Sequence, residues 1–190
     1  MGEFRLIEWT TKASKGLENI ISRGGANKAK LALQEFSSNA AKVLLEHAEN
    51  TSALGRAVDD FPDVGVNFRV SNGGRFTEIN GKVFIADKGY FQDILNKIDF
   101  TTGKINRKVA EELEAVLGID KGKLSNANEI AMLDLKNVKN FGLKMPTTTD
   151  GGKYFIEGGA TIGSVPERII DGPINLIDNG AQVRYLQVAD

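Results

Sequence analysis

Apolar residues in the first third of the chain recur at helical spacing. The pattern predicts a short helix around residues 17–22, a break at Gly24-Gly25, and a longer helical stretch that continues to Phe61. The apolar positions of the longer stretch lie mostly three or four residues apart: Ala40, Val43, Leu44 and Ala48, then Leu54, Ala57, Val58 and Phe61. Pro62 ends the helical part, because proline disfavours helix in the residue before it.

The pattern then changes to short alternating runs, which predict strands over residues 66–70, 75–79 and 82–86. Asn80-Gly81 lies between the second and third runs, and this dipeptide is the strongest short signal for a β-hairpin. We therefore expect residues 75–86 to form a hairpin.

Two helical stripes follow, over residues 90–98 and 106–117, and Gly118 is suited to end the second helix. The last third returns to strand-like runs, at residues 130–135, 154–156, 167–170 and 182–186. Because helices and strands do not alternate, this order predicts an α+β fold rather than βαβ units. We expect a helical N-terminal region over residues 1–62, then an α+β domain over residues 63–190 with a small antiparallel sheet and packed helices.

Composition narrows the chemistry that the chain can perform. It has 24 basic and 25 acidic residues, no cysteine and one histidine, His47. The lack of cysteine excludes disulfides, thiolate nucleophiles and Cys-ligated metals, and a single histidine excludes the two-histidine ribonuclease mechanism. His47 is flanked by glutamates, so we expect a partly exposed helix residue.

The N-terminus lacks the apolar core of a signal peptide, and no run approaches the ~18 apolar residues of a membrane-spanning helix. Met1-Gly2-Glu3-Phe4 is typical of a start codon followed by a cloning scar. We therefore expect a larger polypeptide upstream of this chain.

Two adjoining segments are the best candidates for binding and catalysis. Residues 135–149 contain three lysines and no acid, which suits a small patch that holds a phosphate. Residues 143–171 place polar and charged side chains between glycine pairs on predicted loops. Glycine lets the backbone approach a ligand closely, and loops on a rigid sheet commonly carry function.

The same region contains a recognisable succession of motifs. Met132-Leu133-Asp134-Leu135 is followed by Leu143-Lys144-Met145-Pro146-Thr147, an aromatic run that ends at Glu157-Gly158-Gly159, and the run from Ser164 to Asp171. This succession resembles the C-terminal toxin domains of bacterial polymorphic toxins, such as contact-dependent inhibition and Rhs-type effectors. It covers residues 130–171 of the 190.

The resemblance implies an antibacterial toxin used in interbacterial competition, usually a nuclease, that a cognate immunity protein neutralises. Such a domain is secreted or delivered from a bacterial carrier protein and acts in the target-cell cytoplasm. Its N-terminal helical region would assist import or connect to the carrier. The substrate that we expect is RNA, with tRNA or rRNA as candidates. We expect the reaction to need no cofactor.

RNA can be cleaved through its own 2′-hydroxyl when a protein supplies a base and a positive clamp for the phosphate. We expect Glu157 or Glu167 to be the base, assisted by Lys144, Arg168 and Thr161. Side chains that bind the substrate would be Lys136, Lys139, Thr147, Thr149, Lys153, Tyr154 and Arg184.

Other functions stay open. Asp134-Leu135-Lys136 with an upstream acid (Glu112, Glu114 or Asp120) would suit a magnesium nuclease, although acid-x-Lys is a very common triplet. Arg75, Tyr154 and Glu157 would serve a toxin that acts on NAD or transfers ADP-ribose. The near-neutral charge also suits a non-enzymatic module, such as an immunity protein, an adaptor or a phage structural domain.

Overall fold

The computed structural model describes residues 7–190, so the segment Met1-Gly2-Glu3-Phe4 lies outside the described residues. The helices are α1 Thr11–Ser22, α2 Ala26–Glu35, α3 Ser38–Ala48, α4 Gln92–Leu95, α5 Arg107–Leu117 and α6 Leu176–Asn179, with short 3₁₀ helices η1 Val58–Asp60, η2 Lys88–Tyr90 and η3 Val138–Phe141. The strands are β1 Val64–Val70, β2 Glu78–Ile79, β3 Lys82–Ala86, β4 Lys104–Asn106, β5 Glu129–Lys136, β6 Glu167–Asp171, β7 Ile174–Asn175 and β8 Gln182–Ala189.

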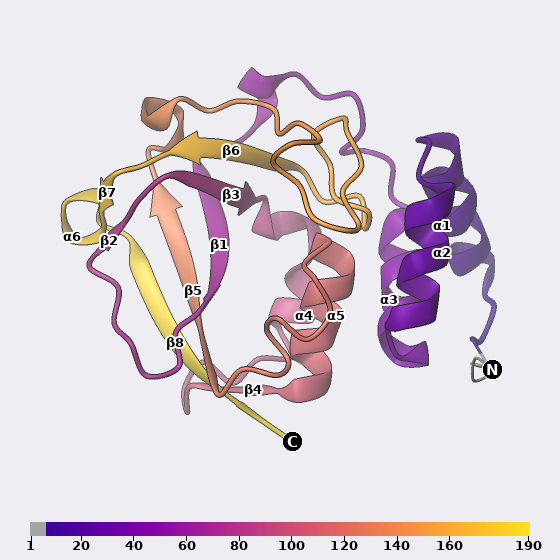
Figure 1. The fold of residues 1–190 in the computed structure, drawn as a ribbon, viewed down its shortest axis with the longest axis horizontal. Coiled ribbons are helices and arrows are strands. Elements are labelled where there is room, and N and C mark those ends of the chain that lie inside the picture. The colour runs from indigo at the N-terminus through magenta and orange to yellow at the C-terminus, as the bar shows by residue number, and fades with distance from the viewer. Residues whose placement is uncertain (1–6) are drawn as a thin grey trace.

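Six strands form the main sheet, in the order β4-β8-β5-β1-β3-β6 (Figure 1). All neighbours are antiparallel except β4 and β8, which run parallel. Strands β2 and β7 form a separate antiparallel pair. The helices precede the sheet and are interspersed with it without forming βαβ units, so the predicted α+β class is confirmed.

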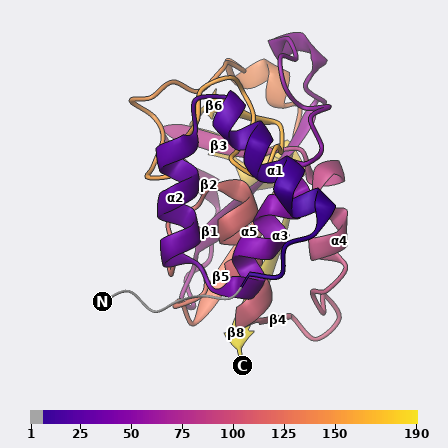
Figure 2. The ribbon, with the colours of Figure 1, turned by 90° about the vertical axis from the view of Figure 1, so that its right-hand side faces the viewer.

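The helices lie in two layers beside the sheet. Helices α4 and α5 lie close to one face, and α1, α2 and α3 lie beyond α5 (Figures 1 and 2). One hydrophobic cluster joins α5 to the sheet, and Leu113 of α5, Ile130 of β5 and Leu186 of β8 are among its buried members. None of the helices within residues 7–190 is long and apolar enough to cross a membrane.

A second hydrophobic cluster crosses the expected boundary at residue 62. Phe36 and Leu44 of the N-terminal helices pack in it with Ala115 of α5 and with Tyr154 and Ile156. The N-terminal region therefore shares a core with the rest of the chain.

Side-chain caps divide the predicted long helix into α2 and α3. Ser37 caps α3 by accepting a hydrogen bond from the amide of Ala40 at 3.2 Å, so the chain breaks at Phe36-Ser37. The expected continuation to Phe61 is wrong, because the chain after Ala48 forms turns and η1. Gly55 adopts a positive φ of 71° there, which a helix does not allow.

The expected hairpin over residues 75–86 is also wrong in its pairing. The turn itself is present, with Gly81 at a φ of 72°, but β2 pairs with β7 and β3 pairs with β1 and β6. Ile79 of β2 is buried beside Ile174 of β7 in a third hydrophobic cluster. Burial of that side chain, rather than the local turn signal, decides the partner of β2.

Two further predicted elements differ from the structure. The helix expected over residues 90–98 is reduced to α4. The run Tyr154-Phe155-Ile156 is a turn rather than a strand, and the amide of Phe155 donates to Gly152 O at 3.2 Å. Its outer two side chains are buried among the N-terminal helices, which accounts for the apolar pattern.

Gly16 allows α1 and α3 to approach each other closely. A Cβ added at Gly16 would lie 1.7 Å from the carbonyl oxygen of Leu45. We expect Gly16→Ala to lower the free energy of unfolding by about 1–3 kcal/mol, because the backbones must move apart. Urea denaturation measures the change. Lys15→Ala, at an exposed position of the same helix, is the control and should stay within about 0.5 kcal/mol of the wild type.

Candidate functional site

The candidate site is a cavity of about 680 Å³ that opens where β1 and β3 diverge. These strands pair only at Val66 and Ala86, and beyond that pair they separate. The side-chain amide of Asn67 spans the gap and donates to Phe84 O at 2.8 Å. The loop after α5 and the loop around residues 150–155 provide the remaining walls.

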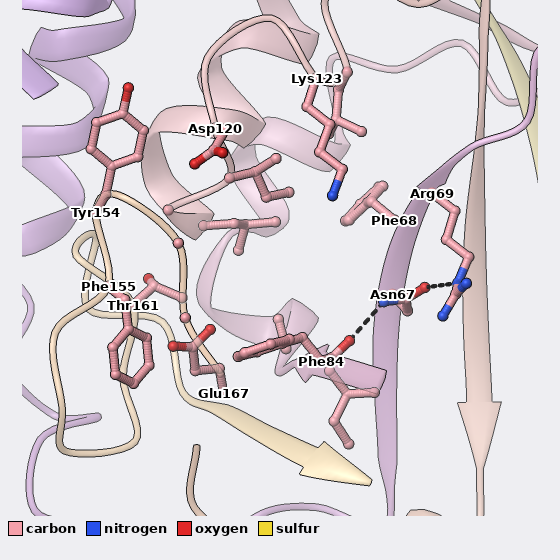
Figure 3. Close-up of a pocket in the computed structure, with 18 of the residues that line it drawn as sticks. Asn67, Phe68, Arg69, Phe84, Asp120, Lys123, Tyr154, Phe155, Thr161 and Glu167 are labelled. Atoms are coloured by element: carbon pink, nitrogen blue, oxygen red, sulfur yellow. Dashed lines mark hydrogen bonds between the residues drawn. The ribbon is translucent and has the colours of Figure 1, made fainter. Parts of the chain in front are cut away.

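Glu167, the first residue of β6, points its carboxyl group into this cavity between Phe155 and Phe84 (Figure 3). The residue is 8% exposed. Its backbone amide donates to Gly159 O at 2.9 Å, but its carboxyl group has no hydrogen bond or ion pair within residues 7–190. A buried carboxyl group that faces open space is free to exchange a proton with a ligand.

Burial raises the pKa of Glu167 to about 8, and the positive charges of Arg23 and Arg168 partly oppose this increase. The carboxyl group is therefore mostly protonated at neutral pH. A carboxyl group whose pKa lies this close to neutrality is suited to general acid–base catalysis.

Two cations line the cavity without an acidic partner in the described part of the chain. Arg69 of β1 donates its Nε–H to the side-chain oxygen of Asn67 at 2.8 Å, and burial lowers the pKa of its guanidinium. Lys123, in the loop after α5, points toward the centre of the cavity near Phe68 (Figure 3). Arg69 follows Phe68 in β1 and so points to the opposite face of the sheet, whereas Lys123 lies on the face of Phe68 and Glu167; each can hold an anion such as a phosphate at its own end of the cavity.

Aromatic rings form much of the cavity wall. Phe68 of β1 and Phe84 of β3 lie on its sheet side, and Phe155 lies opposite on the 150–155 loop (Figure 3). Flat apolar surfaces of this kind stack on nucleobases, and such stacking does not require a particular base. Aromatic walls with two cations that have no acidic partner in the described chain, and with the buried acid Glu167, suit a nucleotide-like ligand.

An ion pair fixes the loop at the rim of the cavity. The Lys82 ammonium lies 2.7 Å from Asp150, and together with hydrogen bonds from Thr147 it holds the pKa of Asp150 at about 2. Asp120 lies at the rim too, close to Gly152. The carboxylate of Asp150 therefore has a structural task, whereas that of Asp120 is exposed to solvent.

A short hairpin over residues 159–167 carries Glu167 to the cavity. Ala160 pairs with Pro166, and Ser164 adopts a φ of 59° in the turn. The Thr161 hydroxyl donates to Val116 O of α5 at 2.7 Å and accepts from the amide of Val165 at 3.1 Å. These bonds fix the hairpin against the end of α5.

Three of the predicted site residues line the cavity: Glu167, Thr161 and Tyr154. Thr161 is buried, and its hydroxyl is occupied by backbone partners. Tyr154 points away from Glu167 toward the N-terminal helices (Figure 3), and its ring packs against Phe36 in a tilted arrangement with ring centroids 5.1 Å apart. Burial and the negative charge of Glu35 raise the pKa of Tyr154 to about 12, so the phenol stays protonated.

Arg168 follows Glu167 in β6, so its side chain points to the opposite face of the sheet. It is 1% exposed and donates to Gly159 O, Glu167 O, Arg56 O and Ala57 O. Its guanidinium also lies 5.4 Å from the ring centroid of Phe61. These bonds give Arg168 a structural role outside the cavity.

The other predicted residues do not line the cavity. Lys144 pairs with Asp171 at 3.2 Å, Lys153 with Glu35 at 3.3 Å, and Lys139 donates to Asp59 O at 3.3 Å. The exposed residues of this group are Lys136, Lys139, Lys144, Thr147, Thr149, Lys153 and Glu157. The Thr147 hydroxyl bonds to Asp150, and the Arg184 guanidinium stacks over Phe100 at 4.6 Å.

The residues proposed for magnesium have other partners. Lys88 lies 3.3 Å from Asp134, Lys97 lies 2.7 Å from Glu112, and Glu114 accepts bonds from Leu124 N and Ser125 N. No group of three or more His, Cys, Asp or Glu side chains suited to a metal ion occurs within residues 7–190.

The set proposed for NAD chemistry is dispersed. Arg75 pairs with Glu129 at 2.8 Å and stacks on Tyr185, whereas Glu157 is exposed and Tyr154 is buried. His47 lies on α3 with its side chain 14% exposed, and its ring nitrogens contact Asp93 Oδ1 at 3.0 Å and Val43 O at 2.9 Å. Its position on a helix is confirmed.

Sequence reasoning missed Arg69, Asn67 and Lys123. Arg69 and Asn67 alternate with apolar residues in a strand, a pattern that usually indicates a solvent-facing side of the sheet. Arg69 and Asn67 lie beside the cavity only because β1 diverges from β3. No local signal distinguishes Lys123 from the other lysines of its loop.

No protein-family model matches this chain, and comparisons with curated proteins and with solved structures also found no match.

The raised pKa of Glu167 makes stability depend on pH. The folded state keeps a proton up to about pH 8, whereas the unfolded chain releases it near the ordinary value of 4.5. Stability contributed by this group is thus present below pH 4.5 and declines as the pH rises to about 8, by at most about 1.4 kcal/mol per unit. Urea denaturation across this window should show the decline relative to Glu167→Gln. The exposed control Glu157→Gln should follow the wild-type slope, and parallel curves for wild type and Glu167→Gln would contradict the assignment.

Proposed function

We propose that this protein is an antibacterial toxin domain that cleaves RNA without a metal ion, with Glu167 as the acid–base residue. The observation that carries the proposal is the buried carboxyl group of Glu167, which faces a cavity and has no partner in the described chain. The motif pattern over residues 130–171 supports the toxin class. A cognate immunity protein and delivery by a larger carrier belong to the same proposal.

The cavity residues suit the parts of a transesterification. Lys123, on the same side of the sheet as Glu167, holds the scissile phosphate and offsets charge that develops on it, and Arg69, at the other end of the gap, holds an adjoining phosphate. Phe68, Phe84 and Phe155 receive the neighbouring base. The ionised form of Glu167 accepts the proton of the 2′-hydroxyl as its oxygen attacks phosphorus. The protonated form then donates that proton to the 5′ oxygen as its bond to phosphorus breaks. One residue thus acts first as the base and then as the acid.

A second function, cleavage of NAD, is favoured by the size of the cavity. Its volume of about 680 Å³ lies in the range of sites for small molecules. In that case the residues of the cavity, and not the dispersed set of Arg75, Tyr154 and Glu157, would hold the dinucleotide. The aromatic walls and the cations suit a dinucleotide as well as they suit RNA.

Expression in bacteria that lack a partner protein tests the proposal. We expect the wild-type chain to stop growth and to produce discrete RNA fragments on a gel, whereas Glu167→Gln is harmless. Intact RNA together with depleted NAD would favour the second function. Harmless expression of soluble wild-type protein would contradict both and favour a non-enzymatic module.

With purified protein, Glu167→Gln should reduce RNA cleavage by roughly 10²- to 10⁴-fold, because amides do not transfer protons at neutral pH. The assay contains excess chelator, and cleavage that the chelator abolishes would contradict the metal-independent mechanism. Glu157→Gln is the matched control, since its carboxyl group is exposed and outside the cavity. It should retain the wild-type rate.

Arg69→Gln tests the phosphate site. Loss of one charged donor to an adjoining phosphate should reduce the cleavage rate by roughly 10- to 10²-fold. Arg184→Gln, two strands away in β8 with its guanidinium over Phe100, is the matched control and should cleave RNA normally. Equal effects of the two substitutions would show that general positive charge, rather than the cavity, holds the substrate.

A further inference from the structure

The N-terminal helices contact the hairpin that carries Glu167 through the side chain of Arg23, through Ile162, which packs in the second hydrophobic cluster, and through the Ser164 hydroxyl, which donates to Ala48 O at 3.4 Å. Arg23, the residue that ends α1, donates from its two terminal nitrogens to Thr161 O at 2.8 Å and to Ala160 O at 2.7 Å. These carbonyl groups belong to adjacent residues in the first arm of the hairpin, more than 130 positions away in the sequence. A planar guanidinium holds such a pair of acceptors in one orientation.

Nearby contacts show that the hairpin and the 150–157 loop pack against the same helices. The ring of Phe36 packs against that of Tyr154, and Lys153 pairs with Glu35 of α2. Gly25, two residues after Arg23, is in close contact with Ile156, because a Cβ added there would lie 2.5 Å from that side chain. Two walls of the cavity thus depend on the helical region.

We infer that Arg23 is a positioning residue of this site, and that the N-terminal helices form part of the site instead of serving only for import or connection. Arg23 fixes the Ala160–Thr161 backbone, and the hairpin passes this constraint on through the Ala160–Pro166 pair to Glu167. The inference deepens the proposed function, because it rests on the role assigned to Glu167.

The charge of Arg23 also bears on the proton affinity of Glu167. It lowers the pKa of Glu167 against the larger effect of burial, as does Arg168 from the same strand. The remaining charged groups around the cavity are Arg69 of β1, Lys82 of β3, Asp150 of the 150–155 loop, and Asp120 and Lys123 of the loop after α5. Lys82 and Asp150 neutralise each other in an ion pair.

Two substitutions separate the charge of Arg23 from its hydrogen bonds. Arg23→Met removes both, whereas Arg23→Lys keeps the charge but replaces the planar pair of donors with a single ammonium. Lys30→Met, at an exposed position of α2, is the control. All variants are made in the full chain, and neither measurement below uses RNA or turnover, so failure of the proposed function would leave them interpretable.

The first measurement is hydrogen exchange of the amides of Thr161, Ser164 and Val165, each of which is hydrogen-bonded within the hairpin. We expect exchange at least about tenfold faster in both Arg23 variants, which corresponds to about 1.4 kcal/mol of lost local protection. Amides of β5 and β8 should keep their wild-type rates. Unchanged exchange in the hairpin would overturn the inference.

The second measurement is the titration of the Glu167 carboxyl carbon by NMR, assigned by the loss of its signal in Glu167→Gln. The midpoint should rise by roughly half a unit or more in Arg23→Met and stay near the wild-type value in Arg23→Lys and Lys30→Met. An unchanged midpoint in folded Arg23→Met would overturn the inference. If both Arg23 variants unfold globally while Lys30→Met stays folded, the inference is also overturned, because Arg23 would then stabilise the whole fold rather than position the site.

Discussion

The site depends on the separation of β1 from β3 beyond one pair, Val66 with Ala86. A continuous ladder would place these strands about 4.8 Å apart and leave no space between them. Asn67 replaces part of the missing ladder by donating to Phe84 O, so this carbonyl group stays satisfied while the strands separate. The gap is what admits a ligand to Glu167.

Strand β6 places an acidic side chain, Glu167, and a basic side chain, Arg168, on opposite faces of the sheet. Neighbouring side chains of β6 point to opposite faces. The carboxyl group of Glu167 therefore faces the cavity, whereas the guanidinium of Arg168 donates to the backbone carbonyl groups of Arg56 and Ala57. The two terminal nitrogens of Arg168 donate to fixed acceptors and stabilise the fold, although its buried Nε has no hydrogen-bond partner within residues 7–190. Glu167 lacks hydrogen-bonded partners of this kind, and burial, which the charges of Arg23 and Arg168 only partly offset, is the physical reason for its raised pKa.

The hairpin that leads into β6 connects this strand to two helical layers. Thr161 anchors it to Val116 at the end of α5, and Arg23 anchors it to the end of α1. Such anchoring matters for an acid–base residue, because proton transfer requires the carboxyl group to lie within hydrogen-bond reach of the reacting atom. The shared core around Phe36 and Tyr154 gives the same support to the opposite wall.

The sequence by itself determined the α+β class, the helix that Gly118 ends, and the strands over 130–135, 167–170 and 182–186, because these features follow from local periodicity and turn chemistry. It also indicated Glu167, through its place in a glycine-rich polar segment. Only the tertiary structure decided that β2 pairs with β7, that Tyr154 belongs to the core, and that Arg69 and Lys123 accompany Glu167. These outcomes depend on contacts between residues far apart in the chain, and local patterns carry no information about such contacts.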